Sequence, residues 1–262
     1  QPIGGEAMTI AASETVDVEA PPPPERRWTR DRIVGHALVG LWILTGVLLV
    51  GYLISAWNPE LFRKYAPSYI KGLGVTLTLV VVSTILGALL SIPIAAGRMS
   101  KNPFFSALAY AYVYFFRGTP LLAQTFLIYY GLGSFRPQLE AVGLWTFFRE
   151  AWYCAVLAFT LNTAAYQAEI LRGAIESVGR GQWEGAASLG LRKWQTLRKV
   201  ILPQALIVAL RPYGNEIILM IKGSAIVAII TVHDLMGATR LAFSRSFDFQ
   251  TYIWAALLYL AL

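Results

Sequence analysis

The sequence predicts an all-α membrane protein, and three observations support this fold class. Of the 262 residues, 56% are hydrophobic and only 14% are charged, whereas a soluble domain carries roughly 25% charged residues. Several uncharged, mainly apolar runs reach the roughly 18–20 residues that a helix needs to cross a bilayer. These runs lack the polar–apolar alternation of membrane-spanning strands. We therefore expect helices, which satisfy their backbone hydrogen bonds within one segment.

The N-terminal part is expected to contain a tail followed by one membrane helix. Residues 1–35 are poor in aromatic residues and include the run PPPPERR, which predicts a disordered tail. The uncharged run at 36–57 is long enough for one span. No cleavable signal peptide is recognised at the start. The chain is expected to continue beyond Leu262, because its last apolar run is too short to span.

Five further apolar runs are expected to span the membrane. They lie at 72–97, at 103–132, from about Ala151, at 202–222 and from about Phe249. The run at 103–132 contains FFRGTP, and its proline is expected to break that helix. Non-helical backbone at membrane depth is tolerated only inside protein or against water, so this segment is expected to form part of a pathway wall.

The distribution of positive charge predicts the orientation of these spans. Lys and Arg residues concentrate in three segments, at 26–32, 98–101 and 172–199, and the positive-inside rule places such segments in the cytoplasm. The N-terminus and the polar loop at 176–203 are therefore expected to be cytoplasmic. No Lys/Arg cluster is interleaved with aromatic residues, so nucleic-acid binding is not expected.

Cysteine and histidine usage argues against a metal site. Cys154 lies in an apolar run, where a small buried residue is expected. His36 and His233 are far apart and have no ligand-like neighbours. No metal is therefore expected on this chain.

The segment EGAASLGLRKWQTLRKVILP, residues 184–203, is a polar interruption between two apolar runs. Its small residues leave a helix surface that another protein can approach closely. Glu184 offers an anionic contact near the start of that helix, where the helix dipole favours it, and a proline is tolerated in the first turn of the next span. On composition alone, an ordinary solvated amphipathic loop is the favoured alternative to docking. The candidate docking residues are Glu184, Gly185, Ala186, Ala187, Gly190 and Pro203.

This spacing resembles the EAA loop of permease subunits in ATP-binding-cassette importers, whose pattern is E-A-A, three residues, Gly, nine residues, I-x-L-P. Gly185 and Val200 depart from that pattern. The segments YVYFFRGTPLLAQTFLIYYGL, LAFTLNTAAYQAEILRGAIESV and GNEIILMIKGSAIVAIITVHDLM are similar to the polar amino-acid branch of the family. Within it, the chain resembles the subgroup that imports histidine, lysine, arginine, ornithine or octopine-like conjugates.

The resemblance implies a type I importer transmembrane domain at 68–262, with a five-helix core, one extra N-terminal helix and a coupling loop at 176–203. It implies a multi-pass protein of the bacterial inner membrane. Its partners would be an ABC ATPase dimer, a second permease (identical or sister), a solute-binding protein and an amino-acid substrate. No phosphate-binding GxxxxGK[ST] motif occurs, so ATP and Mg are expected on the ATPase and no cofactor on this chain.

Charged residues within or near the spans are candidates for the substrate path. An ionisable group at mid-bilayer costs at least about 2.5 kcal/mol, so it needs a partner or a polar cavity. A cationic amino acid requires a carboxylate, and we expect Glu169 to supply it. Asn162, two helical turns earlier on the same face, and Thr119 are expected as hydrogen-bond partners. Alternatively, Glu169 pairs with Arg172 at i+3 on the helix surface.

Arg117 and Glu216 are expected to have a structural role along the pathway. Opposite charges on neighbouring spans can pair, and a buried pair of this kind often fixes geometry more than it adds stability. Whether substrate contacts this subunit directly is left open by the sequence.

The function that these features favour is that of a transport subunit of an ATP-driven amino-acid importer. The alternative is an autonomous multi-span channel, with GSAIVAII as a re-entrant filter, or an ion-coupled transporter; a channel would have no need of the EAA loop. An intramembrane hydrolase is improbable, because the chain has two isolated histidines and no HExxH motif.

Overall fold

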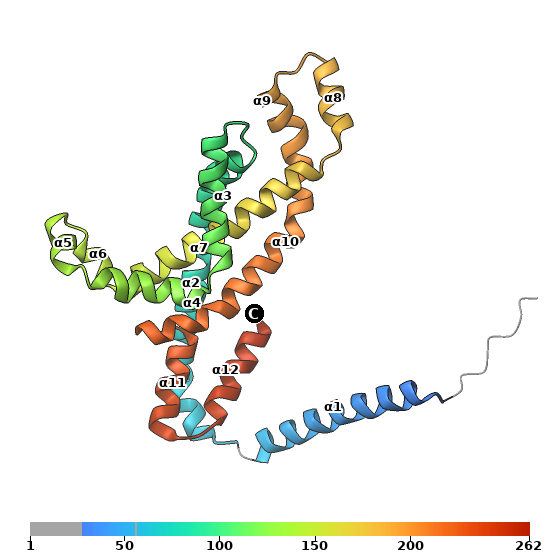
Figure 1. Ribbon diagram of the computed structural model, residues 1–262. Coiled ribbons are helices and arrows are strands. Elements are labelled where there is room, and N and C mark those ends of the chain that lie inside the picture. The colour runs from blue at the N-terminus through green and yellow to red at the C-terminus, as the bar shows by residue number, and fades with distance from the viewer. Residues whose placement is uncertain (1–27, 56) are drawn as a thin grey trace, which may run out of the picture. The chain divides into compact units, whose positions relative to one another are not determined.

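The computed structural model describes residues 28–55 and 57–262, and within these ranges every regular element is a helix (Figure 1). The predicted all-helical class is thereby confirmed. The chain divides into two units at residues 56–57, and each is described by itself.

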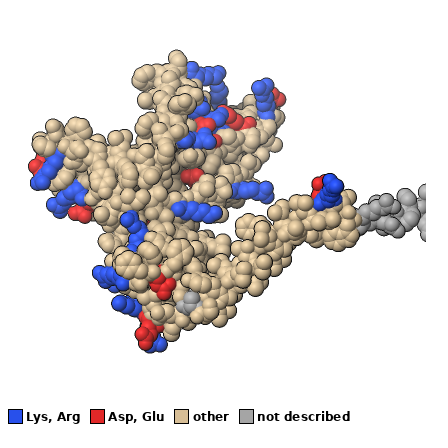
Figure 2. All heavy atoms as spheres, turned by 60° about the horizontal axis from the view of Figure 1, so that its bottom comes forward, with Lys and Arg blue, Asp and Glu red and all other residues tan. Residues whose placement is uncertain are grey.

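The first unit contains α1 (Arg30–Ser55), which has no buried residue. Its charged side chains are confined to the first turn, at residues 30–32 (Figure 2). The helix begins earlier than position 36, so residues 30–35, assigned above to the tail, are helical. Hydropathy marks only the apolar part of a helix, whereas Thr29 Oγ1 accepts a hydrogen bond from the Arg32 N–H (3.4 Å) and supports the earlier start. The predicted tail at 1–27 lies outside the described residues.

The second unit is built around long helices with short ones between them. In order these are α2 (Pro59–Arg98), α3 (Pro103–Gly118), α4 (Leu121–Phe126), η1 (Leu127–Gly131), α5 (Arg136–Ala141), α6 (Trp145–Phe148), α7 (Ala151–Ser177), α8 (Arg180–Ser188), α9 (Lys193–Thr196), η2 (Leu197–Ile201), α10 (Leu202–Gly223), η3 (Ser224–Ile230), α11 (Leu235–Ser246) and α12 (Gln250–Ala261). Within this unit, α8 and α9 lie at one end, and α11 and α12 lie towards the other (Figure 1).

Three helical runs among the described residues are long and apolar enough to cross a membrane. They are α1, α2 and the continuous run Lys193–Ile230, which comprises α9, η2, α10 and η3. The other expected spans correspond to α3 with α4 and η1, to α7 and to α12. α7 has 27 residues but is less apolar, because it packs against α2, α3, α4 and α10 and so has less surface for lipid.

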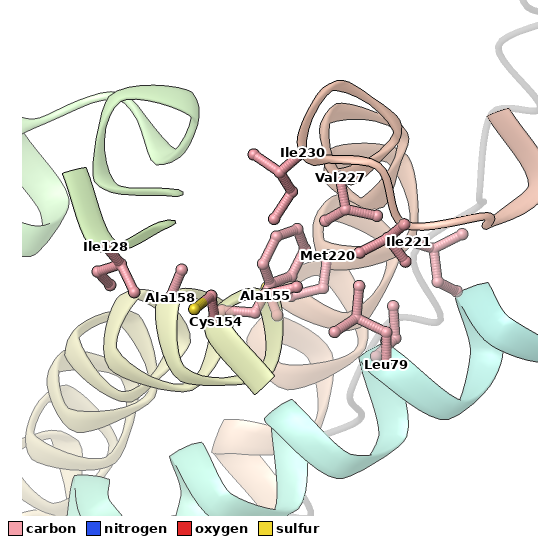
Figure 3. Packing of buried hydrophobic residues seen from close by; sticks show 12 residues of the cluster. Leu79, Ile128, Cys154, Ala155, Ala158, Met220, Ile221, Val227 and Ile230 are labelled. Carbon is pink, nitrogen blue, oxygen red and sulfur yellow. The ribbon is translucent and has the colours of Figure 1, made fainter. Parts of the chain in front are cut away.

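α7 lies at the centre of the second unit. Its first half packs against α2, η1, α10 and η3 in a cluster that includes Leu79, Ile128, Met220 and Ile230 (Figure 3). Cys154 is fully buried in the same cluster, which confirms its predicted environment. Burial of such side chains stabilises the fold by about 25 cal/mol per Å² of apolar surface where water is the alternative.

The crossing of α2 and α7 depends on Gly87. A Cβ at this position would lie 2.5 Å from Thr163 Cγ2 and 3.1 Å from Gln167 Nε2. Glycine therefore lets the two helices approach closely, as small residues do in membrane helix pairs.

α2 is longer than its expected span at 72–97. It begins at Pro59, where Asn58 Oδ1 accepts a hydrogen bond from the Leu61 N–H (3.0 Å) and proline occupies the first turn. With 40 residues, its length is about 60 Å, twice the hydrocarbon thickness of roughly 30 Å. Polar residues near its start are compatible with a helix there, because that part can lie outside the lipid.

The predicted break at FFRGTP is confirmed. α3 ends at Gly118, Thr119 and Pro120 have extended backbones, and α4 begins at Leu121. Proline disfavours the helical conformation of the residue before it, which explains why the helix stops where it does.

Pro203 lies in the first turn of α10, as predicted, but α10 does not follow a loop. The helical run is continuous from Lys193. Proline removes one N–H donor and crowds the preceding turn. Here that turn is the π-helix η2, whose wider hydrogen bonding accommodates the proline without ending the run.

Candidate functional site

The broken helix at Thr119–Pro120 is stabilised by amide side chains. In an intact helix the Phe116 carbonyl would accept from the N–H of residue 120, but Pro120 has none. Instead, Asn162 Nδ2 donates to Phe116 O (3.0 Å), and Gln124 Nε2 donates to the same oxygen (2.9 Å). A partly buried carbonyl is thereby satisfied where an unpaired one would be costly.

Gln124 connects two of the predicted site residues. Its Nε2 also donates to Thr119 Oγ1 (2.7 Å), and its Oε1 accepts from Asn162 Nδ2 (3.0 Å). Asn162 and Thr119 thus belong to one partly buried network, in which Gln124 is the shared member. Sequence reasoning missed Gln124, although an amide in the apolar run PLLAQTFLIYY is itself a signal, because a polar group at such depth needs partners.

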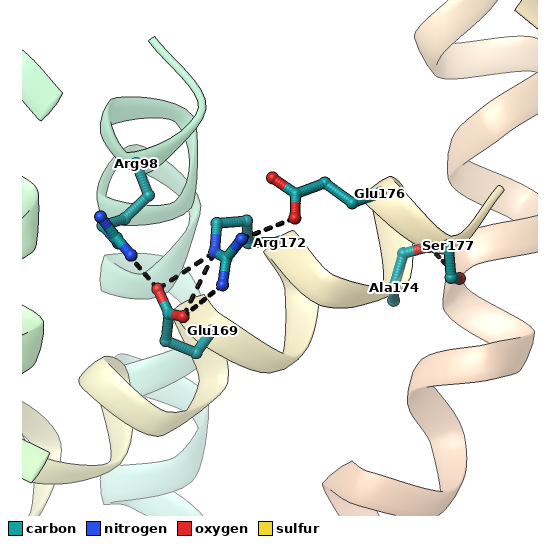
Figure 4. A network of polar contacts seen from close by, with 6 residues as sticks. All are labelled: Arg98, Glu169, Arg172, Ala174, Glu176 and Ser177. Atoms are coloured by element: carbon teal, nitrogen blue, oxygen red, sulfur yellow. Dashed lines mark hydrogen bonds and ion pairs between the residues drawn. The ribbon is translucent and has the colours of Figure 1, made fainter. Parts of the chain in front are cut away.

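Glu169 lies in a second, ionic network (Figure 4). Its Oε1 accepts from Arg98 Nε of α2 (2.8 Å), and its Oε2 accepts from Arg172 Nη2 of α7 (2.7 Å). Arg172 Nη1 in turn donates to Glu176 Oε2 (2.6 Å). The side chains of Arg98 and Glu169 are only 18% and 14% exposed, so the charge-assisted bonds are largely shielded from water. The i+3 contact with Arg172 is present, and Arg98 is an additional partner that the sequence did not indicate.

A cavity of about 410 Å³ opens beside Glu169. This volume falls in the range of roughly 300–1,000 Å³ that is common for small-molecule sites. It is lined by Arg98, Tyr110, Val113, Tyr114, Arg117, Gly118, Tyr166 and Glu169. Several of these side chains belong to α3, the helix whose Phe116 carbonyl binds Asn162, so Glu169 and Asn162 both lie toward α3, as their seven-residue spacing predicts.

Arg117 and Glu216 are not joined by an ion pair in the part of the chain that the structure describes. The Arg117 guanidinium lies over the Tyr166 ring, 5.0 Å from its centre, in a cation–π arrangement. Glu216 is buried in α10, and its Oε1 accepts from Thr163 Oγ1 (3.0 Å). Thr163 Oγ1 also accepts from Gln167 Nε2 (3.1 Å), so Glu216 connects α10 to the polar face of α7.

The polar segment at 184–203 folds as a helical hairpin, α8 followed by α9 and η2. Two hydrogen bonds end α8: the Gly190 N–H donates to Ala187 O (2.9 Å), and the Leu191 N–H donates to Ala186 O (3.1 Å). Together with the positive φ of Gly190 (+73°), this is a Schellman motif, in which glycine is preferred because it has no Cβ. Within the hairpin, α8 packs against α9 and η2.

The residues of this hairpin divide between an inner and an outer face. Ala186 is 5% exposed and faces the hairpin, whereas Glu184, Gly185 and Ala187 are exposed. A Cβ at Gly185 would have no atom within 4 Å, and Pro203 is also exposed. The predicted small residues therefore form an accessible surface at three of the four positions on α8 and the turn after it.

Two large apolar side chains flank this surface. Leu189 is 81% exposed and Trp194 is 68% exposed. Exposed apolar residues next to a polar surface are typical of protein interaction sites, and Trp is enriched among the residues that dominate binding. Sequence reasoning gave Trp194 no binding role and did not consider Leu189, because the sequence alone does not show which side chains of the hairpin are exposed.

Comparison with known proteins places these features in a family. The family described as the binding-protein-dependent transport system inner membrane component matches residues 85–262. The nopaline transport system permease protein NocM of Agrobacterium fabrum is 44% identical over 202 residues, which cover 77% of this chain and 84% of NocM. The arginine ABC transporter permease protein ArtM of Haemophilus influenzae is 39% identical over 191 residues, which cover 73% of this chain and 83% of ArtM.

A solved structure agrees with these relatives. The crystal structure of an amino acid ABC transporter with histidines matches with a TM-score of 0.69 and 36% sequence identity, over 78% of this chain and 92% of the other. The matched region includes the broken helix, the ionic network and the hairpin. The chain therefore belongs to the binding-protein-dependent inner membrane components, and within them to the permeases of polar amino-acid ABC transporters.

Proposed function

We propose that this permease imports cationic amino acids or opine-type conjugates. The observation that carries the proposal is the Glu169 carboxylate, which lines the 410 Å³ cavity together with Arg98 and Arg117. A carboxylate suits the cationic side chain of such a substrate, and a guanidinium suits its α-carboxylate. The named cargo of the nopaline and arginine permeases supports the same substrate class.

Asn162 and Thr119 serve this site by holding the broken helix in place. Their hydrogen bonds to Gln124 and to the Phe116 carbonyl keep the α3 wall of the cavity at a fixed distance from α7. Arg117 on α3 and Glu216 on α10 form further parts of the pathway wall, and Arg117 is available to the substrate carboxylate.

The hairpin of α8 and α9 is proposed to dock on an ABC ATPase dimer. Glu184, Gly185, Ala187 and Gly190 give a surface that a partner can approach, and Leu189 and Trp194 give it apolar anchors. Ala186 and Pro203 support it from the inner face and from the start of α10. ATP and Mg would be held by the ATPase, whose closure would move the hairpin and switch the pathway between outward and inward states.

We also propose which helices form the transmembrane core and how they are oriented. The five-helix core consists of α2, the broken helix α3–α4–η1, α7, the run Lys193–Ile230 and α12, and α1 is an additional span. The N-terminus and the hairpin face the cytoplasm, in line with the concentration of Lys and Arg there. A core of five helices forms one half of a pathway, so a second permease completes it and an external solute-binding protein delivers the substrate.

The test is the uptake of labelled L-arginine and of a neutral amino acid by proteoliposomes containing the complete transporter. Glu169→Gln removes the negative charge but keeps the side-chain shape, so arginine uptake should fall about tenfold or more, since a hydrogen bond to a charged group contributes roughly 1.5–3 kcal/mol. Uptake of the neutral substrate should fall much less.

The matched control is Glu176→Gln. Glu176 binds the same arginine, Arg172, but its side chain is 51% exposed, so its replacement should change uptake less than about twofold. An equal loss for cationic and neutral substrates in Glu169→Gln would show that Glu169 is structural.

A further inference from the structure

The Glu169 carboxylate already holds a guanidinium that belongs to the protein. Arg98 Nε donates to Glu169 Oε1 (2.8 Å), and the Arg98 guanidinium carbon lies 4.9 Å from the centre of the Tyr110 ring. A carboxylate and an aromatic face thus enclose one planar cation. Arg98, Tyr110 and Glu169 all line the cavity in which the substrate is expected.

The two arginines on Glu169 are not equivalent. Arg172 lies three residues away on the same helix, α7, and is also held by Glu176, so this contact persists whenever α7 is intact. Arg98 is the last residue of α2, and its contact joins two different helices (Figure 4). Arg98 is therefore the partner that can leave while Arg172 keeps the carboxylate oriented.

We propose that Arg98 is a resident substitute for the cationic side chain of the substrate, and that a guanidinium-bearing amino acid or conjugate displaces it from Glu169 Oε1 and the Tyr110 face. This inference rests on the proposed function, in which Glu169 receives the substrate cation. The substrate class is narrower than cationic amino acids in general, because a planar guanidinium fits both the carboxylate and the ring, whereas an ammonium is a compact point charge.

Displacement of Arg98 by the substrate makes the contact between α2 and α7 differ between the empty and the loaded protein. In the empty state the Arg98 contact ties the end of α2 to α7, and it keeps the Glu169 charge paired. In the loaded state the substrate takes over the pairing and the tie between the helices is released. The apparent affinity for substrate equals the intrinsic affinity multiplied by the fraction of molecules in which Arg98 has left the position.

The experiment measures equilibrium binding of labelled L-arginine and L-lysine to the complete permease–ATPase complex in lipid nanodiscs, without the solute-binding protein. In Arg98→Ala the resident competitor is absent, so L-arginine should bind about three- to tenfold more tightly, as expected for loss of a partly buried ion pair and a cation–π contact. Arg98→Lys keeps a cation without the planar stack and should give a smaller gain. The wild type should bind L-arginine more tightly than L-lysine.

The control is Lys101→Ala, which removes an exposed positive charge three positions later and should leave binding unchanged. Unchanged or weaker L-arginine binding in Arg98→Ala would show that Arg98 is a structural contact or a ligand of the substrate, and so would overturn the inference. An equal gain in Lys101→Ala would do the same, because the effect would then come from net charge.

Glu169→Gln separates the two proposals. If it weakens L-arginine binding while Arg98→Ala gives no gain, the displacement fails and the substrate site stands. If it leaves L-arginine binding unchanged, the substrate site fails and the displacement fails with it. A thermal unfolding midpoint within a few degrees of the wild type establishes that each variant is folded.

Discussion

Gly190 has a φ of +73°, a backbone region in which a residue with a Cβ costs roughly 1–2 kcal/mol. The two hydrogen bonds that end α8 require that angle. The glycine of the EAA pattern is thus explained by backbone conformation at least as much as by small size. Gly185 differs, because it lies inside α8 with open space around its Cβ position.

These two glycines should respond differently to the same substitution. Gly190→Ala should destabilise the hairpin by about 1 kcal/mol and lower substrate-stimulated ATPase activity of the reconstituted transporter several-fold. Gly190→Asn should lose less, since Asn tolerates the left-handed region. Gly185→Ala should stabilise α8 by about 1 kcal/mol and keep coupling. Lost coupling in Gly185→Ala would instead indicate that the ATPase approaches the backbone at that point.

The helices illustrate how far the sequence determines the elements. Apolar runs predicted where helices exist, and the break at Pro120 and the start of α7 at Ala151 agree with the structure. The ends of α1 and α2 differ, because a helix can extend beyond the lipid into polar sequence that hydropathy does not mark. The continuity of the run from Lys193 depends on the π-helix η2, and a π-helix has no hydropathy pattern that distinguishes it from an α-helix.

The site was predictable in its residue types but not in its pairings. Intramembrane polar groups were recognisable because they are costly in lipid, which singled out Glu169 and Asn162. Their partners Arg98 and Gln124 come from other helices, and such contacts depend on how helices cross. Crossing is set by features such as the close approach at Gly87, which a sequence pattern alone does not fix.

The broken helix offers a test at the level of elements. Asn162→Ala and Gln124→Ala each leave one amide donor on the Phe116 carbonyl, so each should cost about 1 kcal/mol of unfolding free energy. The double variant leaves this carbonyl without those donors and should cost more than the sum, by about 1–3 kcal/mol. Thermal unfolding of the purified complex measures the difference.

The control for this pair is Thr125→Val. Thr125 is also fully buried, but its hydroxyl donates to the Leu121 carbonyl of its own helix (2.9 Å), which keeps its backbone partner. Thr125→Val should therefore reduce the unfolding free energy least among these variants. Strictly additive effects of Asn162→Ala and Gln124→Ala would mean that the two amides do not share the role of satisfying Phe116.

On the scale of the whole molecule, the predicted family and its transport function are confirmed by the relatives and by the matching solved structure. The count of five core helices plus one stays a prediction. The proposed substrate site and the hairpin proposed to dock on the ATPase occupy different parts of the second unit and are linked by α7, which carries Glu169 and leads directly into α8. We therefore expect that ATPase stimulation can be impaired while substrate binding is retained.

Glu184→Lys should show this separation. The substitution reverses an exposed charge on the proposed docking surface, so substrate-stimulated ATPase activity should fall several-fold while membrane insertion and L-arginine binding are retained. Glu60→Lys, a charge reversal at the start of α2, should leave coupling intact. Normal stimulation in Glu184→Lys would rule out Glu184 as a docking residue.

The hydrogen bonds from the Asn162 and Gln124 side-chain amides to the Phe116 carbonyl also restrict how this protein can change shape. If α3 slid away from α7, the partly buried Phe116 oxygen would lose its Asn162 donor and keep only Gln124, and the Asn162 amide would lose an acceptor. We therefore expect α3, α4 and α7 to move as a single rigid body during each transport cycle. Hinge motion would then be confined to segments outside this hydrogen-bonded group, such as residues 178–179 between α7 and α8.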